Sequence, residues 1–528
     1  MIKIGIANKL ENVINNISPT WGLNRAVARK KHNIINSGYS HHGASYSKKS
    51  LAGWISSGGS TKEDIDDNLS TLRERSRDLY MGAPIATGAI KTIRTNVVGS
   101  GLMLRPQIDY EILKMSDEEA RAWERKAQRE FALWADTPHC DAERMNNFYE
   151  LQQLAFLSFL ASGECFALLP VIKRPNIPYD LRVKLIEADR VSTPTFEYNN
   201  SKIINGVEIG LHGEVVAYYI SNFHPLGTQT IKKEWKRTSK YGKKSGRPNV
   251  LHLMDAERPE QRRGVPILAP VIESLKQLAR YSEAELTAAV ISGMYTVFIE
   301  SPNDVDTENS PFGQTNFEYD DDTNYDEIDD QDREIKLGNG AVVELGNGEK
   351  INVANPGRPN ANFDGFVTSI SRQIGSALEL PYELLVKQFT ASYSASRASL
   401  LEAWKMFRMR RTWLSNDFCQ PIYEEWLTEA IAKGRINAPG FFNDPLVRKA
   451  YCGAEWNGPT QGQLDPLKEV NAAAKRVDNG FSTRTRETQE LTGGDYNIYI
   501  KQRKEEEKQM KEVNDINANE PSKTANTK

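Results

Sequence analysis

The chain has 528 residues, of which 39% are hydrophobic, and its 67 basic and 70 acidic side chains leave a formal net charge of -3. A chain of this length is too long for one compact core, so we expect roughly two to four structural regions in a large soluble protein. The near-neutral charge argues against tight binding of nucleic acid by an overall positive field.

Secretion, membrane insertion and metal binding are not expected. The first residues contain only a short apolar patch with no cleavage site after it, and no uncharged apolar run is long enough to span a bilayer. The cysteines lie far apart, without a CxxC pair or a histidine at metal-ligand spacing. We therefore expect no cofactor, and buried thiols in a reducing compartment at Cys140, Cys165, Cys419 and Cys452.

The first part of the chain should be mainly helical after a mobile start. Residues 1–60 mix basic residues with Ser, Gly and Asn, which is typical of a mobile segment. Ser116 and Glu119 fit a capping box, and apolar residues follow at helical spacing. Residues 150–159 predict a further apolar helix, which Gly163 ends. The buried face of the helix after Ser116 should carry Ala120, Trp123, Ala127, Phe131 and Trp134.

Between residues 164 and 254 the hydrophobic period changes to two, which predicts a small β-rich module. Turn formers such as Asn205-Gly206 separate the candidate strands. Residues 230–246 are rich in lysine, glycine and serine and should form a basic loop. The candidate strands are residues 165–169, 182–186, 203–209, 215–220 and 250–253.

Two helical patterns flank a turn-rich segment in the middle of the chain. Residues 266–300 carry a broad apolar stripe and predict one helix of roughly 50 Å. The acidic tract at residues 303–332 has little apolar content and should be a loop. Residues 341–345 and 350–353 are expected to pair as a hairpin. The second helix should cover residues 363–380, before Pro381.

The C-terminal part is again mainly helical. The small polar residues 388–396 predict a flexible loop, and residues 396–432 return to helical spacing with a kink at Pro421. A last helix is expected over residues 466–479, whereas residues 501–528 have almost no apolar content and should be disordered. The aromatic residues should fill a core or a subunit interface, because duplex bases are already stacked: Trp404, Phe407, Trp413, Phe418, Tyr423 and Trp426.

No pattern for catalysis is present. The G-x-x-x-x-G-K-[ST], H-E-x-x-H and G-x-S-x-G motifs are missing, and the seven histidines are scattered. The run Gly163-Glu164-Cys165 places a carboxylate beside a thiol, but no base lies close in sequence, so we interpret it as structural packing. The sequence therefore does not predict an enzyme.

Two charged clusters leave alternatives open. The basic residues that follow residue 396 either contact DNA phosphates or pair with acidic residues of a neighbouring subunit. The acidic tract is a solvated insertion, a source of negative potential near a channel, or a docking surface for a basic partner. Calcium binding is disfavoured, because the tract lacks the glycine and terminal glutamate of an EF-hand loop. The basic residues are Arg397, Lys405, Arg408, Arg410 and Arg411.

Two longer motifs stand about a hundred residues apart. The first is Glu257-Arg-Pro-Glu-Gln-Arg-Arg-Gly-Val-Pro266, and the second is Leu380-Pro-Tyr-Glu-Leu-Leu-Val-Lys-Gln-Phe389, which continues as Ser392-Tyr-Ser-Ala-Ser-Arg-Ala-Ser-Leu-Leu-Glu402. Weaker motifs occur at residues 69–77, 96–101, 163–164 and 464–469. In this order and spacing, they resemble the portal proteins of lambda-type tailed phages.

The resemblance implies an α+β portal fold with a β-rich wing, long stem helices, a clip hairpin and a mainly helical crown. It places a mobile N-terminal segment at residues 1–60, the wing at 61–264, the first stem helix at 265–300, and the clip with an acidic insertion at 301–360. The second stem helix follows at 361–386, the tunnel loop at 387–396, a helical wing and crown region at 397–500, and a disordered tail at 501–528. Family members commonly carry a more compact clip.

The resemblance also implies a homo-oligomeric ring, by analogy a dodecamer, at one capsid vertex. Double-stranded DNA would pass through it without sequence specificity during packaging and ejection. Its partners would be the terminase large subunit, the major capsid and scaffold proteins, and a head-completion or tail adaptor protein. The ring would assemble in the host cytoplasm and remain in the virion, with no membrane involved.

The resemblance assigns two sets of site residues. The tunnel loop would bring Lys387, Gln388, Phe389, Thr390, Ser392 and Tyr393 near the DNA. Terminase would dock at Asp320, Asp322, Asp326, Asp329 and Asp330. Two other hypotheses remain: another minor head or adaptor protein of a phage, and a DNA-processing enzyme, which would require convergent acidic or nucleophilic residues.

Overall fold

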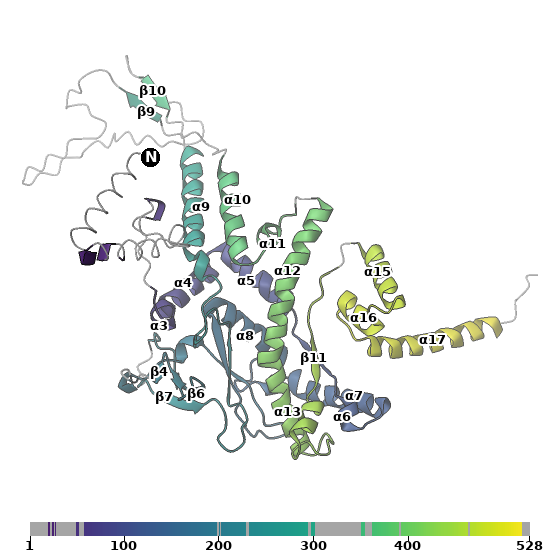
Figure 1. Cartoon of the computed structure of the whole chain (residues 1–528). Coiled ribbons are helices and arrows are strands. Elements are labelled where there is room, and N and C mark those ends of the chain that lie inside the picture. Colours follow the sequence, from purple (N-terminus) through teal and green to yellow (C-terminus); the bar gives the residue numbers. More distant parts are fainter. Residues whose placement is uncertain are drawn as a thin grey trace, which may run out of the picture. The chain divides into compact units, whose positions relative to one another are not determined.

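The computed structural model describes residues 58–197, 202–228, 232–293, 297–300, 350–353, 362–389, 392–462 and 465–519, together with residue 200 and a few short stretches before residue 52. The chain divides into two compact units, Met1–Asp64 and Ile65–Lys528. The first contains the short helix α3, Thr61–Asp64. The second holds the main hydrophobic core and all the sites considered below (Figure 1).

Four helices build the first half of this core. The predicted buried face of α7 is confirmed, because every apolar residue named for it is buried in the structure. The helices are α4 Leu69–Gly82, α5 Pro84–Val97, α7 Asp117–Ala135 and α8 Phe148–Ser162, with the short α6 Tyr110–Leu113 between α5 and α7.

The starts of α7 and α8 are fixed by local hydrogen bonds. The predicted capping box is confirmed: the Glu119 N–H donates to Ser116 Oγ at 3.3 Å, and the Ser116 N–H donates to Glu119 Oε2 at 2.9 Å. A second capping box joins Asn147 and Glu150 at the start of α8. Such pairs satisfy backbone donors that a helix N-terminus leaves open. As predicted, α8 ends at Gly163, whose φ is 87°.

The predicted β-rich module contains two small antiparallel sheets, ordered β3-β2-β8 and β4-β5-β6-β7. They enclose a core of their own, which includes Phe166, Tyr218 and Ile220. The strands are β2 Glu164–Leu168, β3 Lys184–Ile186, β4 Ile203–Ile204, β5 Val207–Ile209, β6 Val215–Ser221, β7 Trp235–Ser239 and β8 Val250–Met254.

Two predictions within this module need correction. The predicted strand at residues 203–209 is a hairpin, because Asn205 and Gly206 adopt positive φ angles of 45° and 81° and turn the chain between β4 and β5. The predicted basic loop at residues 230–246 contains β7, which pairs with β6. Charged residues obscured this strand, and they are tolerated there because β7 is at the edge of its sheet.

The first long helix is shorter than predicted. A 3₁₀ turn at Ala269–Val271 precedes α9, Ile272–Gly293, which spans about 33 Å at 1.5 Å per residue. The chain then forms β9, Val297–Glu300, rather than continuing as helix to residue 300. Its sequence, with two β-branched residues and a phenylalanine, favours a strand.

The predicted hairpin partner also changes. β10, Lys350–Val353, pairs antiparallel with β9. The expected partner at residues 341–345 lies outside the described residues, as does the whole acidic tract. The two strands of this pair therefore follow α9 and precede α10 in the chain.

Helix α10, Phe363–Ala377, lies beside α9 (Figure 1). The ring of Tyr281 on α9 contacts the rings of Phe363 and Phe366, with centroid distances of 5.4 and 4.9 Å. The prediction that this helix ends before Pro381 is confirmed, although α10 ends at Ala377 rather than at residue 380. The short α11, Tyr382–Val386, begins directly after Pro381.

The long helical pattern after residue 396 is divided in two. Helix α12, Tyr393–Leu414, leads through a π-helical turn, Ser415–Cys419, into α13, Gln420–Ala432. The predicted kink at Pro421 is thus a π-helical turn that ends just before this residue. Pro421 itself occupies the first turn of α13. Proline is tolerated there because the first N–H groups of a helix have no intrahelical partner.

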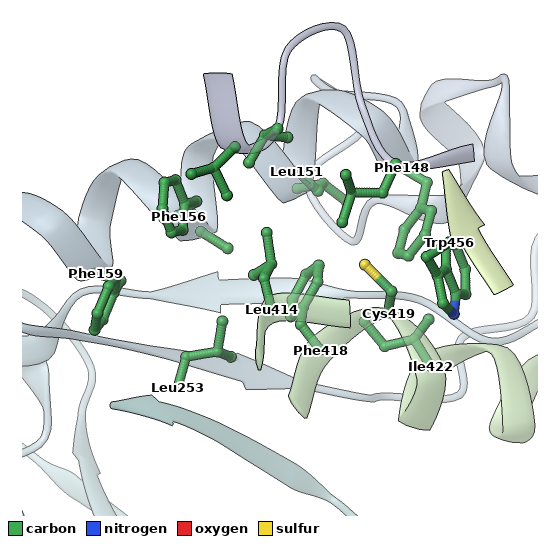
Figure 2. Close-up of a cluster of buried hydrophobic side chains, with 14 of the residues drawn as sticks. Phe148, Leu151, Phe156, Phe159, Leu253, Leu414, Phe418, Cys419, Ile422 and Trp456 are labelled. Carbon is green, nitrogen blue, oxygen red and sulfur yellow. The ribbon is translucent and has the colours of Figure 1, made fainter. Parts of the chain in front are cut away.

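The core joins distant parts of the chain. Figure 2 shows side chains of α8 facing those of the π-helical turn, and the rings of Phe148 and Phe418 stack with centroids 6.0 Å apart. The expectation that the aromatic residues fill a core is confirmed for Trp404, Phe407, Phe418, Tyr423 and Trp426, which are buried. The half-buried ring of Trp413 packs 4.5 Å from that of Phe159.

The four cysteines are free and buried, as predicted. Burial raises the pKa of Cys165 and of Cys452 to about 12, so both thiols are protonated at neutral pH. A thiol in this state is a packing group rather than a nucleophile.

The C-terminal part of the chain is mainly helical, as predicted. β1, Met103–Pro106, pairs antiparallel with β11, Ala454–Asn457.

The prediction of disorder from residue 501 is corrected, because α17 continues to Asn519 with an Arg503–Glu507 hydrogen bond of 2.8 Å. Straight-chain charged residues have high helix propensity even where they bury little surface. Residues 520–528 lie outside the described part. The remaining helices are α14 Pro445–Tyr451, α15 Pro466–Asp478, α16 Arg484–Thr492 and α17 Tyr496–Asn519.

Candidate functional site

The predicted tunnel loop at residues 387–396 is shorter in the structure, because it connects α11 with α12 and α12 already begins at Tyr393. Lys387 ends α11 in a left-handed conformation with φ 56°, and Ser392 caps α12 by accepting a hydrogen bond from the Ala395 N–H at 3.5 Å. Lys387, Gln388 and Phe389 are exposed, and the phenyl ring of Phe389 keeps 51% of its surface accessible. Thr390 and the side chain of Tyr393 lie outside the described residues. The structure thus places an exposed apolar ring on a short connection between two helices.

The basic residues of α12 mostly have partners within the same chain. Arg410 pairs with Glu379 at 3.2 Å, and Lys405 pairs with Glu402 at 2.5 Å. Arg397 lies 3.7 Å from Glu469 of α15. The two alternatives considered for the cluster therefore omitted a third, in which the arginines join parts of one subunit.

Arg411 holds the end of another helix. Its Nε and Nη2 donate to the carbonyls of Val97 and Asn96 at 3.0 and 2.8 Å, at the C-terminus of α5. The guanidinium also lies 5.5 Å from the centroid of the Trp404 ring. Burial lowers the pKa of Arg411 to about 10, so it remains charged at neutral pH. A cation at this place satisfies open carbonyls and the negative end of the helix dipole.

Arg408 differs from the other four. Its side chain is exposed, and no hydrogen bond or ion pair joins it to another described residue. It lines two adjoining cavities of about 610 and 670 Å³ between α12 and the C-terminal helices, the first shared with Arg397 and the second with Arg411. Of the predicted basic cluster, Arg408 is therefore the member most available to an outside anion.

The acidic residues assigned to terminase docking, Asp320, Asp322, Asp326, Asp329 and Asp330, lie outside the described residues. Within the described part of the chain, no group of three or more His, Cys, Asp and Glu is arranged to hold a metal ion. None of the helices in that part is both long and apolar enough to cross a bilayer.

The structure also contains a buried ionic cluster that sequence reasoning missed. We call it the Glu164 anchor: Glu164 on β2, Arg73 on α4, His252 on β8 and Arg263 just before α9. Glu164 Oε1 accepts from Arg73 Nη2 at 2.6 Å and from Arg263 Nε at 2.8 Å, and Oε2 accepts from His252 Nε2 at 2.8 Å. Arg73, His252 and Arg263 lie 91, 88 and 99 positions from Glu164 in the sequence.

Arg263 extends the anchor into the second sheet. Its Nη1 donates to the carbonyls of Val191, at 2.9 Å, and Asn205, and its Nη2 donates to the carbonyl of Ala188 at 2.7 Å. Arg73 in turn donates through Nε to the Ser162 carbonyl at 3.0 Å, at the end of α8. The anchor therefore joins the helical core, both sheets and the chain that leads into α9.

The protonation states in the anchor follow from its environment. Burial alone would raise the pKa of Glu164, but Arg263, Arg73 and His252 outweigh it and hold this pKa far below its usual range. Burial lowers the pKa of His252 more than its hydrogen bond to Glu164 raises it. The imidazole is thus neutral at pH 7, donating from Nε2, while Nδ1 faces the Tyr218 hydroxyl at 3.4 Å.

Two glycines allow this arrangement. A Cβ at Gly163 would overlap the backbone of Gly264 and Val265, and a Cβ at Gly264 would overlap the Gly163 carbonyl. The Gly264 N–H donates to Glu164 Oε2 at 2.9 Å across this close approach. The motifs at residues 69–77, 163–164 and 257–266 therefore meet at this cluster. The overlooked sequence signal is the acid Glu164 in one motif and the arginines Arg73 and Arg263 in the other two.

Comparison with known proteins gives a consistent assignment. The model of the lambda family of phage portal proteins matches residues 47–411. Portal protein B of Escherichia phage lambda is 25% identical over 478 residues, covering 86% of this chain and 87% of its own length. The portal protein of Escherichia phage N15 is 25% identical over 463 residues, covering 84% and 85%.

A solved structure titled as the neck of an empty GTA particle computed with C6 symmetry aligns with a TM-score of 0.47 at 13% identity, covering 80% of this chain and 92% of its own. The family assignment rests on the sequence match, which spans more than half of the chain. The chain belongs to the lambda family of phage portal proteins.

Proposed function

We propose that identical copies of this chain close into a ring at one capsid vertex, by resemblance of twelve subunits, and that double-stranded DNA passes through its channel during packaging and ejection. α9 and α10 would be the stem helices, the segment between them the clip, and residues 61–264 the wing. The ring would form in the host cytoplasm and persist in the virion. Its role is mechanical, with no catalytic step.

The observation that carries this proposal is an uncovered apolar surface on α9 and α10. Leu286 and Val290 on α9 keep 67% and 52% of their surface exposed, and Phe366 on α10 keeps 47%. Single exposed apolar residues are ordinary, but these three lie on two helices that contact each other through Tyr281. In a cyclic ring, the same patch on each subunit meets a different patch on the next. We infer that a neighbouring copy covers these side chains.

The loop between α11 and α12, together with the first residue of α12, is proposed to face the channel. It would place Lys387, Gln388, Phe389, Thr390, Ser392 and Tyr393 near the DNA. Its support is the exposure of the described residues and the position of the loop between two helices. A single lysine and an aromatic ring grip phosphates weakly, which suits a duplex that must slide. Arg408 is the best placed of the α12 cations to meet a phosphate or an acid of the next subunit.

The partners follow from the family and are part of the proposal. Terminase would dock at the acidic residues Asp320, Asp322, Asp326, Asp329 and Asp330, and head-completion or tail adaptor proteins would replace it after packaging. Scaffold and major capsid proteins would surround the wing. If the chain were instead a DNA-processing enzyme, purified protein would cleave duplex DNA in the presence of magnesium, and we expect no cleavage.

The loop assignment is tested by replacing Phe389 with alanine in a phage that carries this chain. We expect oligomeric rings of normal size, because the Phe389 side chain is about half exposed. We also expect a lower mass of packaged or retained DNA. Phe442→Ala is the matched control, since Phe442 is also exposed, at 60%, and lies on another part of the chain. Equal DNA content in Phe389→Ala, Phe442→Ala and parental particles would exclude the loop from DNA handling.

A further inference from the structure

The β-rich module has an open groove between its two sheets. A cavity of about 500 Å³ lies between β7 on one side and β2 and β3 on the other. Leu168, Ile186 and Ile220 contribute apolar side chains to its lining, and all three also border the core between the sheets. The cavity is thus an extension of this small core that opens to the surface.

One wall of the groove is an unpaired strand edge. β7 is the last strand of its sheet and pairs only with β6. The Asn222 N–H donates to the Glu234 carbonyl at 3.0 Å, and the Lys240 N–H donates to the Val216 carbonyl at 2.9 Å. Hydrogen-bonded pairs alternate along an antiparallel ladder. The backbone N–H and C=O groups of Lys236 and Thr238 therefore also point toward β6, whereas those of Trp235 and Arg237 point away from it.

The outward backbone groups at this edge are open. Among the described residues, no hydrogen bond reaches the N–H or C=O of Trp235 or Arg237. The next outward residue, Ser239, shows that the edge accepts partners, because its carbonyl takes a hydrogen bond from Asn249 Nδ2 at 3.2 Å. An open strand edge beside an apolar cavity is the arrangement in which an extended peptide can add as a further strand.

The groove has a positive rim. Lys184, Arg190 and Lys236 line it together with a single acid, Glu234. Lys184 lies 3.3 Å from Glu143, but Lys236 is exposed and has no side-chain partner among the described residues. Ser221, also in the lining, is buried and its Oγ has no hydrogen-bond partner there. These groups favour an occupant that carries carboxylates and hydrogen-bond donors or acceptors.

We propose that this groove binds an extended acidic peptide segment of a partner protein. The peptide backbone pairs with the outward groups of Trp235 and Arg237 and forms a fifth strand on the sheet. One of its apolar side chains enters the cavity against Ile186 and Ile220, and its carboxylates lie near Lys236 and Lys184. Duplex DNA is a poor occupant, because its backbone offers neither strand-pairing groups nor an aliphatic side chain for the cavity floor.

The test uses the full-length chain and two fluorescein-labelled decapeptides, one alternating glutamate with valine and one alternating lysine with valine. Fluorescence anisotropy should show that the acidic peptide binds at least about tenfold more tightly than the basic one, since rim charges select against like charge. Lys236→Glu should weaken the acidic peptide by about fivefold. Lys244→Glu is the charge-matched control, because Lys244 is exposed in the same segment but does not line the cavity.

The strand edge is tested by Arg237→Pro, which removes the outward N–H without removing a bond of the sheet. We expect it to reduce binding of the acidic peptide by about tenfold or more, because a strand-pairing donor is lost. Arg237→Ala keeps the N–H and loses the side-chain contacts with Glu208 and Ser239, so it should bind within about twofold of the parent. Circular dichroism and thermal melting identify any variant that has not folded. If Arg237→Pro has not folded, the binding of the acidic peptide to Lys236→Glu decides the test.

Three results would overturn the proposal. The two peptides could bind equally well, or Arg237→Pro and Lys236→Glu could both bind as the parent does. Alternatively, deletion of residues 317–332 could tighten binding of the acidic peptide by about tenfold. The last result would mean that the acidic tract of this chain, rather than a partner protein, occupies the groove.

Discussion

The Glu164 anchor places a carboxylate, two arginines and a neutral imidazole where almost no water reaches. The side chains of Glu164, Arg73 and Arg263 have exposures of 0%, 5% and 1%. A buried ion pair gains little over an apolar pair of the same shape, but removal of one member leaves the others charged and unpaired. The anchor therefore specifies one arrangement of its elements rather than adding general stability.

Glu164→Gln tests this interpretation. Because Arg73 and Arg263 would keep buried charges without the carboxylate that both contact, we expect the free energy of unfolding in urea to fall by about 3–5 kcal/mol. Glu208→Gln is the control, since Glu208 pairs with Arg237 at 2.6 Å near the surface. It should cost less than about 1 kcal/mol. Similar losses in both variants would mean that burial of the anchor has no special consequence.

His252 predicts a particular dependence of stability on pH. Its folded pKa lies below the unfolded value, so the folded state resists protonation, and stability that is present above about pH 6.5 is lost as pH falls through the folded pKa. His252→Gln retains a donor for Glu164 but cannot take up a proton. We expect the parent to lose more unfolding free energy than this variant between about pH 7 and 5.

Urea unfolding at several pH values measures this difference. His139→Gln, at an exposed histidine, is the control and should follow the parent. The pKa of Glu164 is also depressed, but its contribution is lost only as pH falls below about 4.3, so it does not interfere in this range. Identical pH dependence in the parent and His252→Gln would contradict the neutral imidazole.

At the scale of elements, the close approach of Gly163 and Gly264 sets how the chain enters α9. Gly264→Ala would place a methyl group on the Gly163 carbonyl, between two backbone segments that the anchor holds. We expect a loss of at least about 2 kcal/mol in unfolding free energy, or a failure to fold. Gly88→Ala in α5 is the control, because nothing lies within 4 Å of its added Cβ.

Gly88→Ala should leave stability unchanged or raise it by about 0.5–1 kcal/mol, because alanine favours helix. Differential scanning calorimetry compares the two variants with the parent. A Gly264→Ala protein as stable as Gly88→Ala would show that the two backbone segments can separate without cost.

Sequence reasoning succeeded where the signal is local. The capping box of Ser116 and Glu119 and the stop before Pro381 depend on residues within a few positions of one another, and both were predicted. The Glu164 anchor was missed because Arg73 and Arg263 lie 91 and 99 positions from Glu164. A partner at that distance has no periodicity or spacing that marks it, so the carboxylate was interpreted as packing.

Two further differences arose from competition between signals. Strand β7 was taken for a loop because its lysine and arginine are exposed at an open edge. α9 was expected to reach residue 300, but Val297–Glu300 pairs with a strand that begins 50 residues later. In both cases the outcome depends on a tertiary partner, which composition alone does not reveal.

At the scale of the whole molecule, family membership and the surface of α9 lead to the same expectation. One subunit cannot enclose a duplex, and its exposed Leu286 and Val290 have no cover within the described chain. Replacement of both by aspartate would put charges into an apolar subunit contact. The variant should therefore form fewer rings than the parent, although each subunit folds normally.

The most direct test of the central claim is negative-stain electron microscopy of the purified full-length chain, supported by sedimentation velocity. The account predicts closed rings with a central hole wide enough for a double helix, and their depletion in the Leu286→Asp, Val290→Asp double variant. It is contradicted if the parent chain remains solitary, even in the presence of newly assembled capsid and terminase components.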